Sequence, residues 1–310
     1  MADNQNDTAP NNGVEPANDP ALGSGPVIVA DDHASNHAET QQSLASSSTS
    51  VTSSIFRHRL ENGWTYHKLK DGKYAYSNDQ KEKDRLDLQH DIYLLTLDYK
   101  LGLAPPNDDN SGIRRVLDIG AGTGLWAIDF GESHPEAEVL DVDLPPVQTQ
   151  FVPPNVRFEV EDVEEPWLYS RPFDYKFLKQ TSDGLVPGGY VEAFEGNFRP
   201  GCDDGTLTSE HAISKWVDHI EECGRIFRRL YIDIPSLVSL LKEVGFVDVT
   251  DAHYIELGSW CLENLMGGLE AFSMAPFTRT LGWTKDEVIV FLIDVRKELR
   301  DRGIHAYNPM

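Results

Sequence analysis

The sequence predicts an α/β fold built on a doubly wound, mostly parallel sheet, and two observations carry this prediction. From Arg114 onward, short apolar runs alternate with segments of helical periodicity. The first apolar run, Arg115–Ile119, leads directly into the glycine-rich turn Gly120–Gly124. Strands that alternate with helices form parallel βαβ units, and such sheets bind ligands at the carboxyl ends of their strands.

The later elements follow from the same local patterns of apolar spacing, turn residues and helix caps. Strands are expected at Glu138–Val142, Val156–Val160, Gly189–Phe194 and Phe246–Thr250. Helices are expected at Leu125–Ser133, at Ser209–Phe227, from Pro235 to a C′ glycine at Gly245, and from the capping box of Thr284 and Glu287 to about Arg302.

Ahead of the sheet, the composition divides the chain into two parts. Residues 1–54 contain no Lys, Arg or aromatic residue and are rich in Asn, Asp, Ala, Pro and Ser, so we expect a disordered tail. Residues 55–310 are expected to form one domain, with a cap at 55–110 and the sheet with its C-terminal helices at 111–310. The cap begins with an aromatic-rich segment and contains a predicted helix at Asn78–Leu101.

Composition and charge narrow the classes of partner. The 310 residues are 40% hydrophobic, enough for a sizeable core, and carry a formal net charge of −24. So negative a surface argues against binding to nucleic acid or to an anionic membrane. The three widely spaced cysteines fit neither a disulfide framework nor a zinc site. Without a signal peptide or a membrane-spanning run, the expected compartment is the cytoplasm, with the nucleus as the alternative.

The glycine turn is compatible with two kinds of nucleotide-like ligand. Dinucleotide enzymes use G-x-G-x-x-G in this place, but the position of the third glycine is Leu125 here. The pattern present is G-x-G-x-G over Gly120, Gly122 and Gly124, with Asp118 two residues before it. A carboxylate at this position suits a ligand that carries an ammonium group and would repel a pyrophosphate.

Acidic residues also follow the second and third strands. Asp143 ends the second strand about 20 residues after the turn, where a carboxylate can accept both ribose hydroxyls of an adenosine. A structural role as a turn or N-cap carboxylate is the alternative. Asp162 follows the third strand and can accept from an adenine amino group, while the backbone N–H of Val163 donates to the ring.

In this order and at these intervals, the segment resembles the class I S-adenosylmethionine-dependent methyltransferases, which have a Rossmann-like fold. More narrowly, residues 55–310 resemble the fungal LaeA-like group, many of whose members sit in metabolite gene clusters. The matching stretches are Asp84–His90, Leu117–Trp126, Asp143-Leu144, Val152–Phe158, Glu164–Trp167, Pro187–Glu192 and Ile304–Tyr307. The resemblance implies S-adenosylmethionine as cofactor, with Asp118 and the glycines on its methionine moiety, Asp143 on the ribose, and Asp162 with Val163 on the adenine.

The chain departs from the family pattern at three places. After Phe173-Asp174-Tyr175 a stretch of about 15 residues is expected to be missing, judged from ordinary strand and connection lengths. A shorter gap is expected between Trp260 and Leu262, and the chain ends at Met310 where the family would add a strand. The resemblance places the loop after the fourth strand beside the transferable methyl group. We therefore expect loss of this loop to impair methyl transfer more than cofactor binding.

Three functions remain open at this point. The first is a methyltransferase acting on a small molecule of fungal secondary metabolism, and the second is a cofactor-binding regulator that works through a protein partner. The third is an NAD-dependent oxidoreductase, which Leu125 and the extra acids disfavour. His90 is the best, though weak, candidate for a general base, because its helix could pack over the cofactor mouth. Glu192 and Glu195 follow the late strand and are weaker candidates, and no metal-ligand spacing is present.

Overall fold

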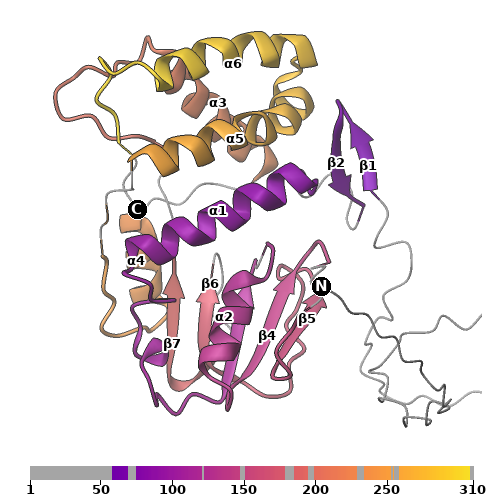
Figure 1. Ribbon diagram of the computed structural model, residues 1–310, viewed down its shortest axis with the longest axis vertical. Helices are drawn as coiled ribbons and strands as arrows, with labels where there is room; N and C mark the ends of the chain where they lie inside the picture. The colour runs from indigo at the N-terminus through magenta and orange to yellow at the C-terminus, as the bar shows by residue number, and fades with distance from the viewer. Residues whose placement is uncertain are drawn as a thin grey trace, which may run out of the picture. The chain divides into compact units, whose positions relative to one another are not determined.

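Five parallel strands form the central sheet of the computed structural model (Figure 1). In chain order they are β3 (Arg115–Ile119), β4 (Glu138–Asp143), β5 (Val156–Val160), β6 (Phe173–Leu178) and β7 (Leu185–Ala193). In space the order is β5-β4-β3-β6-β7, so the chain builds outward from β3 in one direction and then in the other. This confirms the doubly wound sheet and places its switch point between β3 and β6, where such sheets bind ligands.

The structure describes residues 58–68, 75–120, 122–146, 151–178, 185–194, 199–228, 234–252, 254 and 258–307. The predicted tail at 1–54 and the candidate Glu195 lie outside these residues. Within the described part, no helix is both long enough and apolar enough to pass through a lipid bilayer.

Each face of the sheet carries its own hydrophobic core, as the alternation of strand side chains requires. On one face, Val116, Val139 and Tyr175 pack against Trp126 and Phe130 of α2 (Leu125–Ser133), the helix between β3 and β4. The side chains that point to the other face form a second core, against which the segment after β5 packs. This core consists of Leu117, Ile119, Leu140, Val142 and Phe173, with Trp167 and Tyr169 packed against it.

The segment before the sheet contains a hairpin and a long helix. Strands β1 (His58–Glu61) and β2 (Trp64–His67) pair through an Asn62-Gly63 turn, a hairpin that the sequence analysis did not predict. Helix α1 (Gln80–Thr96) starts at Asp79, whose side chain accepts from the N–H of Glu82, and it ends earlier than the predicted Leu101. The positive φ angles of Asp98 and Tyr99 stop it there. A short 3-10 turn, η1 (Pro105–Asn107), leads toward β3.

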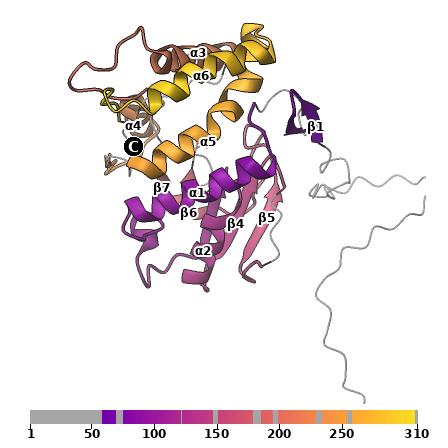
Figure 2. The same cartoon turned by 45° about the horizontal axis from the view of Figure 1, so that its top comes forward.

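The C-terminal helices form a layer with its own core, on the far side of α1 from the sheet in both views (Figures 1 and 2). It consists of α3 (Ala212–Phe227), α5 (Gly258–Pro276), the π-helical turn η2 (Phe277–Leu281) and α6 (Lys285–Leu299). Trp216, Leu269 and Leu292 are among its buried residues. The capping box of Thr284 and Glu287 is confirmed, although α6 stops at Leu299 rather than near Arg302.

One predicted strand is wrong. Helix α4 (Ile234–Glu243) ends before Gly245, whose φ of +102° fits the predicted C′ glycine, but Phe246–Thr250 form no strand. Asp248 has a φ of +53°, which interrupts an extended backbone, and Val247 is 82% exposed. An apolar run becomes a strand only when a sheet edge is available to pair with it, and this segment has found none.

The connection between β6 and β7 is unusually short. The two strands are parallel neighbours, with Tyr175 beside Tyr190 and Phe177 beside Glu192, yet only residues 179–184 separate them. Parallel strands are normally joined by a dozen or more residues that include a helix. The length of this connection therefore agrees with the expectation that residues are missing after Tyr175.

Candidate cofactor-binding site

The glycine turn joins the end of β3 to the start of α2. Gly120, Gly122 and Gly124 have φ angles of +79°, +64° and +82°, a region that side chains disfavour. Gly124 is the N-cap of α2. A Cβ atom on Gly122 would lie 3.1 Å from Cδ1 of Leu86, so α1 passes directly over the turn. The turn is therefore held in a shape that only glycines allow, with its backbone N–H groups at the helix N-terminus.

Asp143 binds the turn from the end of β4. Its Oδ2 accepts a 2.8 Å hydrogen bond from the N–H of Gly122, and its Oδ1 accepts a 2.7 Å bond from the N–H of Leu144. The carbonyl of Asp143 accepts from the N–H of Glu161, which brings the end of β5 alongside. A carboxylate has about four lone-pair sites, so both oxygens retain capacity for ligand hydroxyls.

Asp162 and Val163 follow β5 and complete a row of strand ends. Asp162 is 9% exposed, and its Oδ1 accepts from the N–H of Glu164 at 3.0 Å. The carbonyl of Val163 accepts from Nε1 of Trp167 at 3.2 Å. These bonds fix the turn after β5, so the predicted residues on β3, β4 and β5 lie on one edge of the sheet.

Asp118 lies opposite a second buried carboxyl that the sequence analysis did not single out. Asp118 on β3 and Asp141 on β4 are register partners, and they are 3% and 1% exposed. Burial, with the charges of Asp118 and Asp143 as further causes, raises the pKa of Asp141 to about 10. A signal was present, because Asp141 precedes Asp143 by two residues and so shares its face of the strand.

His90 lies on α1 and contacts α2. Its Nε2 is 2.8 Å from Oδ2 of Asp129, and its side chain is 13% exposed. Glu192 on β7 is engaged elsewhere, since its carboxylate accepts from the N–H groups of Leu103 and Ala104. Glu192 thus fastens β7 to the segment before β3, while His90 links the two helices beside the glycine turn.

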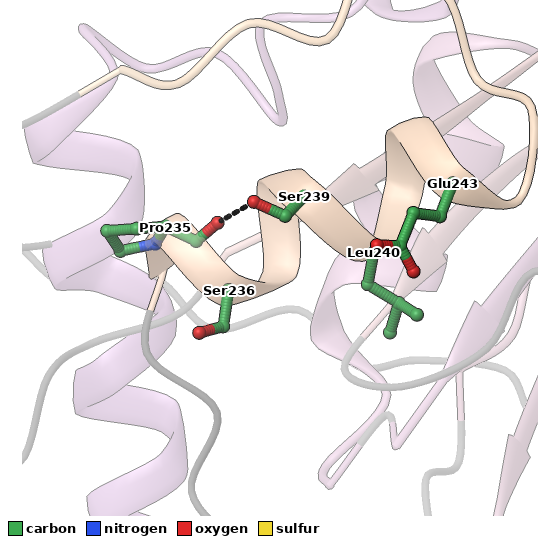
Figure 3. Close-up of a pocket in the computed structure, with 5 residues that line it drawn as sticks. All are labelled: Pro235, Ser236, Ser239, Leu240 and Glu243. Carbon is green, nitrogen blue, oxygen red and sulfur yellow. Dashed lines mark hydrogen bonds between the residues drawn. The ribbon is translucent and has the colours of Figure 1, made fainter.

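The hollow shown in Figure 3 is a separate feature and contains none of the predicted site residues. Its lining residues all belong to α4, namely Pro235, Ser236, Ser239, Leu240 and Glu243. Among the residues that the structure describes, no group of three or more His, Cys, Asp or Glu side chains is arranged to hold a metal ion.

The strand ends therefore offer a consistent set of donors and acceptors. The N-terminus of α2 suits a carboxylate, Asp118 suits an ammonium group, and Asp143 suits a pair of hydroxyls. These groups fit S-adenosylmethionine. A doubly wound sheet in the order β5-β4-β3-β6-β7 with this glycine turn at its switch point is that of a class I methyltransferase.

Curated relatives identify the family more narrowly. The chain is 35% identical to the methyltransferase pytC of Aspergillus terreus, over 84% of this chain and 88% of that protein. It is 34% identical to the secondary metabolism regulator LAE1 of Cochliobolus heterostrophus (80% and 91%) and 31% identical to the probable methyltransferase tdiE of Emericella nidulans (74% and 80%). The chain belongs to the LaeA-like family of fungal methyltransferases.

No family model matches the chain. Among solved structures, YjhP from E. coli aligns with 76% of this chain and 89% of its own at 14% identity, with a TM-score of 0.37.

The alignment with pytC also measures missing sequence. It spans 290 positions but covers 84% of the 310 residues of this chain, about 260 of them. About 30 aligned positions of the relative therefore have no counterpart here. The loss of about 15 residues expected after Tyr175 would account for about half of them.

Proposed function

We propose that this chain binds S-adenosylmethionine at the carboxyl ends of β3, β4 and β5 and transfers its methyl group to a small molecule of fungal secondary metabolism. The observation that carries the proposal is Asp143, whose carboxylate is fixed on the N–H of Gly122 at 2.8 Å. This bond joins the glycine turn to the ribose-binding position in one rigid unit. Such preorganisation lowers the cost of ordering a ligand.

Each predicted residue has a role in this proposal. The glycine turn Gly120–Gly124 and the carboxylate of Asp118 hold the methionine moiety. Asp143 accepts from the ribose hydroxyls, and Asp162 with the N–H of Val163 holds the adenine. Asp118 and Asp162 are buried in the sheet edge, where a fixed acceptor is worth more than in water.

The reaction asks little covalent chemistry of the protein. The bound cofactor supplies a methyl group on a positively charged sulfur, which is already a strong electrophile. The residues of this chain have to align the acceptor with that methyl group and exclude water. For an oxygen acceptor, His90 is our candidate base, and it would have to exchange its contact with Asp129 for one with the acceptor.

The names of pytC and tdiE say methyltransferase and give no acceptor, whereas the laeA protein of Emericella nidulans is called a protein-methionine methyltransferase. We propose a small-molecule acceptor, because this chain is 28% identical to that laeA protein and 35% identical to pytC. We further propose that the protein acts in the cytoplasm, with the nucleus as the alternative.

A second function is favoured by the short connection between β6 and β7. The resemblance places this region beside the transferable methyl group, and residues 179–184 leave no room for the usual crossover helix. In this alternative the chain binds the cofactor but turns over slowly, and it acts as a regulator through a protein partner. Transfer of a labelled methyl group from the cofactor to compounds of a fungal extract would support the enzyme, and cofactor binding without transfer would support the regulator.

Calorimetric titration with S-adenosylmethionine tests the proposed site. We expect the wild type to bind and Asp143→Ala to lose about 10- to 100-fold in affinity, because two hydrogen bonds to a charged acceptor disappear. Asp218→Ala on α3 is the matched control, since its side chain is 57% exposed and pairs with Arg199. Unchanged affinity in Asp143→Ala, or no heat with the wild type, would refute the assignment.

A further inference from the structure

Asp118 and Asp141 form a pair of buried carboxyl groups at the proposed site. They are directly opposite each other on the parallel strands β3 and β4. The side chains of Leu117 and Leu140 belong to the core on the other face, so Asp118 and Asp141 both point to the face covered by α2. In the part of the chain that the structure describes, neither side-chain oxygen of Asp141 has a hydrogen-bond partner.

The surroundings of this pair favour a retained proton. The charges that act on Asp141 are the carboxylates of Asp118 and Asp143, and both oppose its ionisation. From β6, the hydroxyl of Tyr175 lies near Asp118 but donates its hydrogen bond to Glu192. From α1 and α2, His90 is already paired with Asp129. Two adjacent carboxyl groups with so little solvent oppose each other's ionisation.

A cationic ligand changes this balance. S-adenosylmethionine carries a sulfonium, an ammonium and a carboxylate, which sum to one positive charge, whereas the demethylated product S-adenosylhomocysteine lacks the sulfonium charge and is neutral. A positive charge near two carboxyl groups favours their ionised form. If the methionine moiety lies at Asp118, as the proposed function has it, the bound cofactor favours ionisation of both groups.

We propose that Asp118 and Asp141 share one proton in the free protein and release it to solvent when S-adenosylmethionine binds. The pair then carries two negative charges against the cationic cofactor. Loss of the sulfonium charge during transfer lets the pair take a proton back from solvent, which weakens the hold on the neutral product. Asp141 is thus a positioning residue that sets the preference for cofactor over product, an inference that rests on the proposed function.

Proton-linked calorimetry tests the proposal. S-adenosylmethionine is titrated at about pH 8 in two buffers of different ionisation enthalpy, into the wild type and into Asp141→Asn. We expect the wild type to release about half to one proton more than the variant, and its affinity to rise up to about tenfold more per pH unit. The amino group of the cofactor titrates equally in both proteins, so the difference isolates Asp141. Asp218→Asn should behave as the wild type.

Titration with the demethylated product and infrared spectroscopy provide two further tests. With S-adenosylhomocysteine, the extra proton release of the wild type should be smaller, so the ratio of the two affinities rises with pH only when Asp141 is present. If Asp141→Asn does not fold, infrared spectroscopy of the wild type replaces it, because the carbonyl band of a protonated carboxylic acid should disappear when the cofactor is added.

The outcomes separate the inference from the function on which it rests. Binding of S-adenosylmethionine with equal proton release in the wild type and Asp141→Asn, or a persistent carboxylic acid band, would overturn the inference and leave the proposed function standing. No binding of S-adenosylmethionine to the wild type would refute both. Extra proton release in the wild type alone supports both.

Discussion

The unit β3–α2–β4 and the pair β6–β7 are both parallel and both belong to one sheet, yet they are connected in different ways. Between β3 and β4 the chain has room for α2, and every residue of β3 is buried. Between β6 and β7 only residues 179–184 are available, and Tyr190 of β7 is 41% exposed. The pairing of β6 with β7 is also irregular, since its register shifts between Phe173 and Tyr175, whereas β3 and β4 pair without interruption.

Lys176 on β6 is an unusual residue for the interior of a parallel sheet. It lies in the middle of the sheet between Leu117 and Val191, is 0% exposed, and places Nζ 3.8 Å from the centre of the Trp167 ring. Central parallel strands are normally runs of Val, Ile and Leu, so a lysine is out of place there. A lysine is expected here if the residues after Tyr175 occupy strand positions that belong, in the family pattern, to a different segment.

Lengthening the connection after Tyr175 should have the largest effect. Any residues that pytC carries between its counterparts of Tyr175 and Lys176 would be inserted at that junction. We expect methyl transfer to rise about 100-fold, because a misplacement of the order of 1 Å beside the reacting atoms has a cost of that size. Transfer would be measured with a labelled methyl group and a fungal extract.

The control for this insertion is cofactor affinity. It should change by less than about threefold, since the residues that we propose to bind the cofactor belong to β3, β4 and β5 and lie outside the connection between β6 and β7. An insertion protein that binds the cofactor equally well and transfers no more than the parent would contradict the link between the short connection and turnover.

Local sequence patterns were enough to predict much of the half of the sheet that contains β3, β4 and β5. The apolar run at Arg115–Ile119, the glycine turn and Asp143 follow from local spacing, and the structure has the strand, the turn and the helix at these places. The pairing of Asp118 with Asp141 could not be predicted, because it depends on the register between two strands. The strand expected at Phe246–Thr250 failed for a related reason, since pairing needs a partner that a local pattern does not show.

A pair of core substitutions measures the difference in cover. Phe130 of α2 is 0% exposed and stacks on Trp126, so Phe130→Ala should lower the free energy of unfolding by about 3–5 kcal/mol. Tyr190→Ala on β7 should lower it by less than about 1 kcal/mol because the ring is partly exposed. Equilibrium unfolding in urea would measure both. Similar losses for the two variants would show that β7 is covered as well as β3.

A smaller effect than that of Phe130→Ala is expected for the bond that holds β7 in place. The buried hydroxyl of Tyr175 donates to Oε2 of Glu192 at 2.9 Å and accepts from Nδ2 of Asn107 at 3.1 Å. Tyr175→Phe removes both bonds and should lower the free energy of unfolding by about 1–2 kcal/mol in urea at neutral pH. Tyr190→Phe, its neighbour on β7, is the control and should have little effect.

The effect of Tyr175→Phe should also depend on pH in a defined direction. Burial, and then the charge of Glu192, raise the pKa of Tyr175 well above the ordinary value of a tyrosine. A raised pKa in the folded state means that the advantage of tyrosine over phenylalanine is complete below about pH 10 and declines above it, where the unfolded chain ionises first. If the difference in free energy of unfolding between the two proteins grows above pH 10, the Tyr175–Glu192 bond is not what secures β7 to the rest of the sheet.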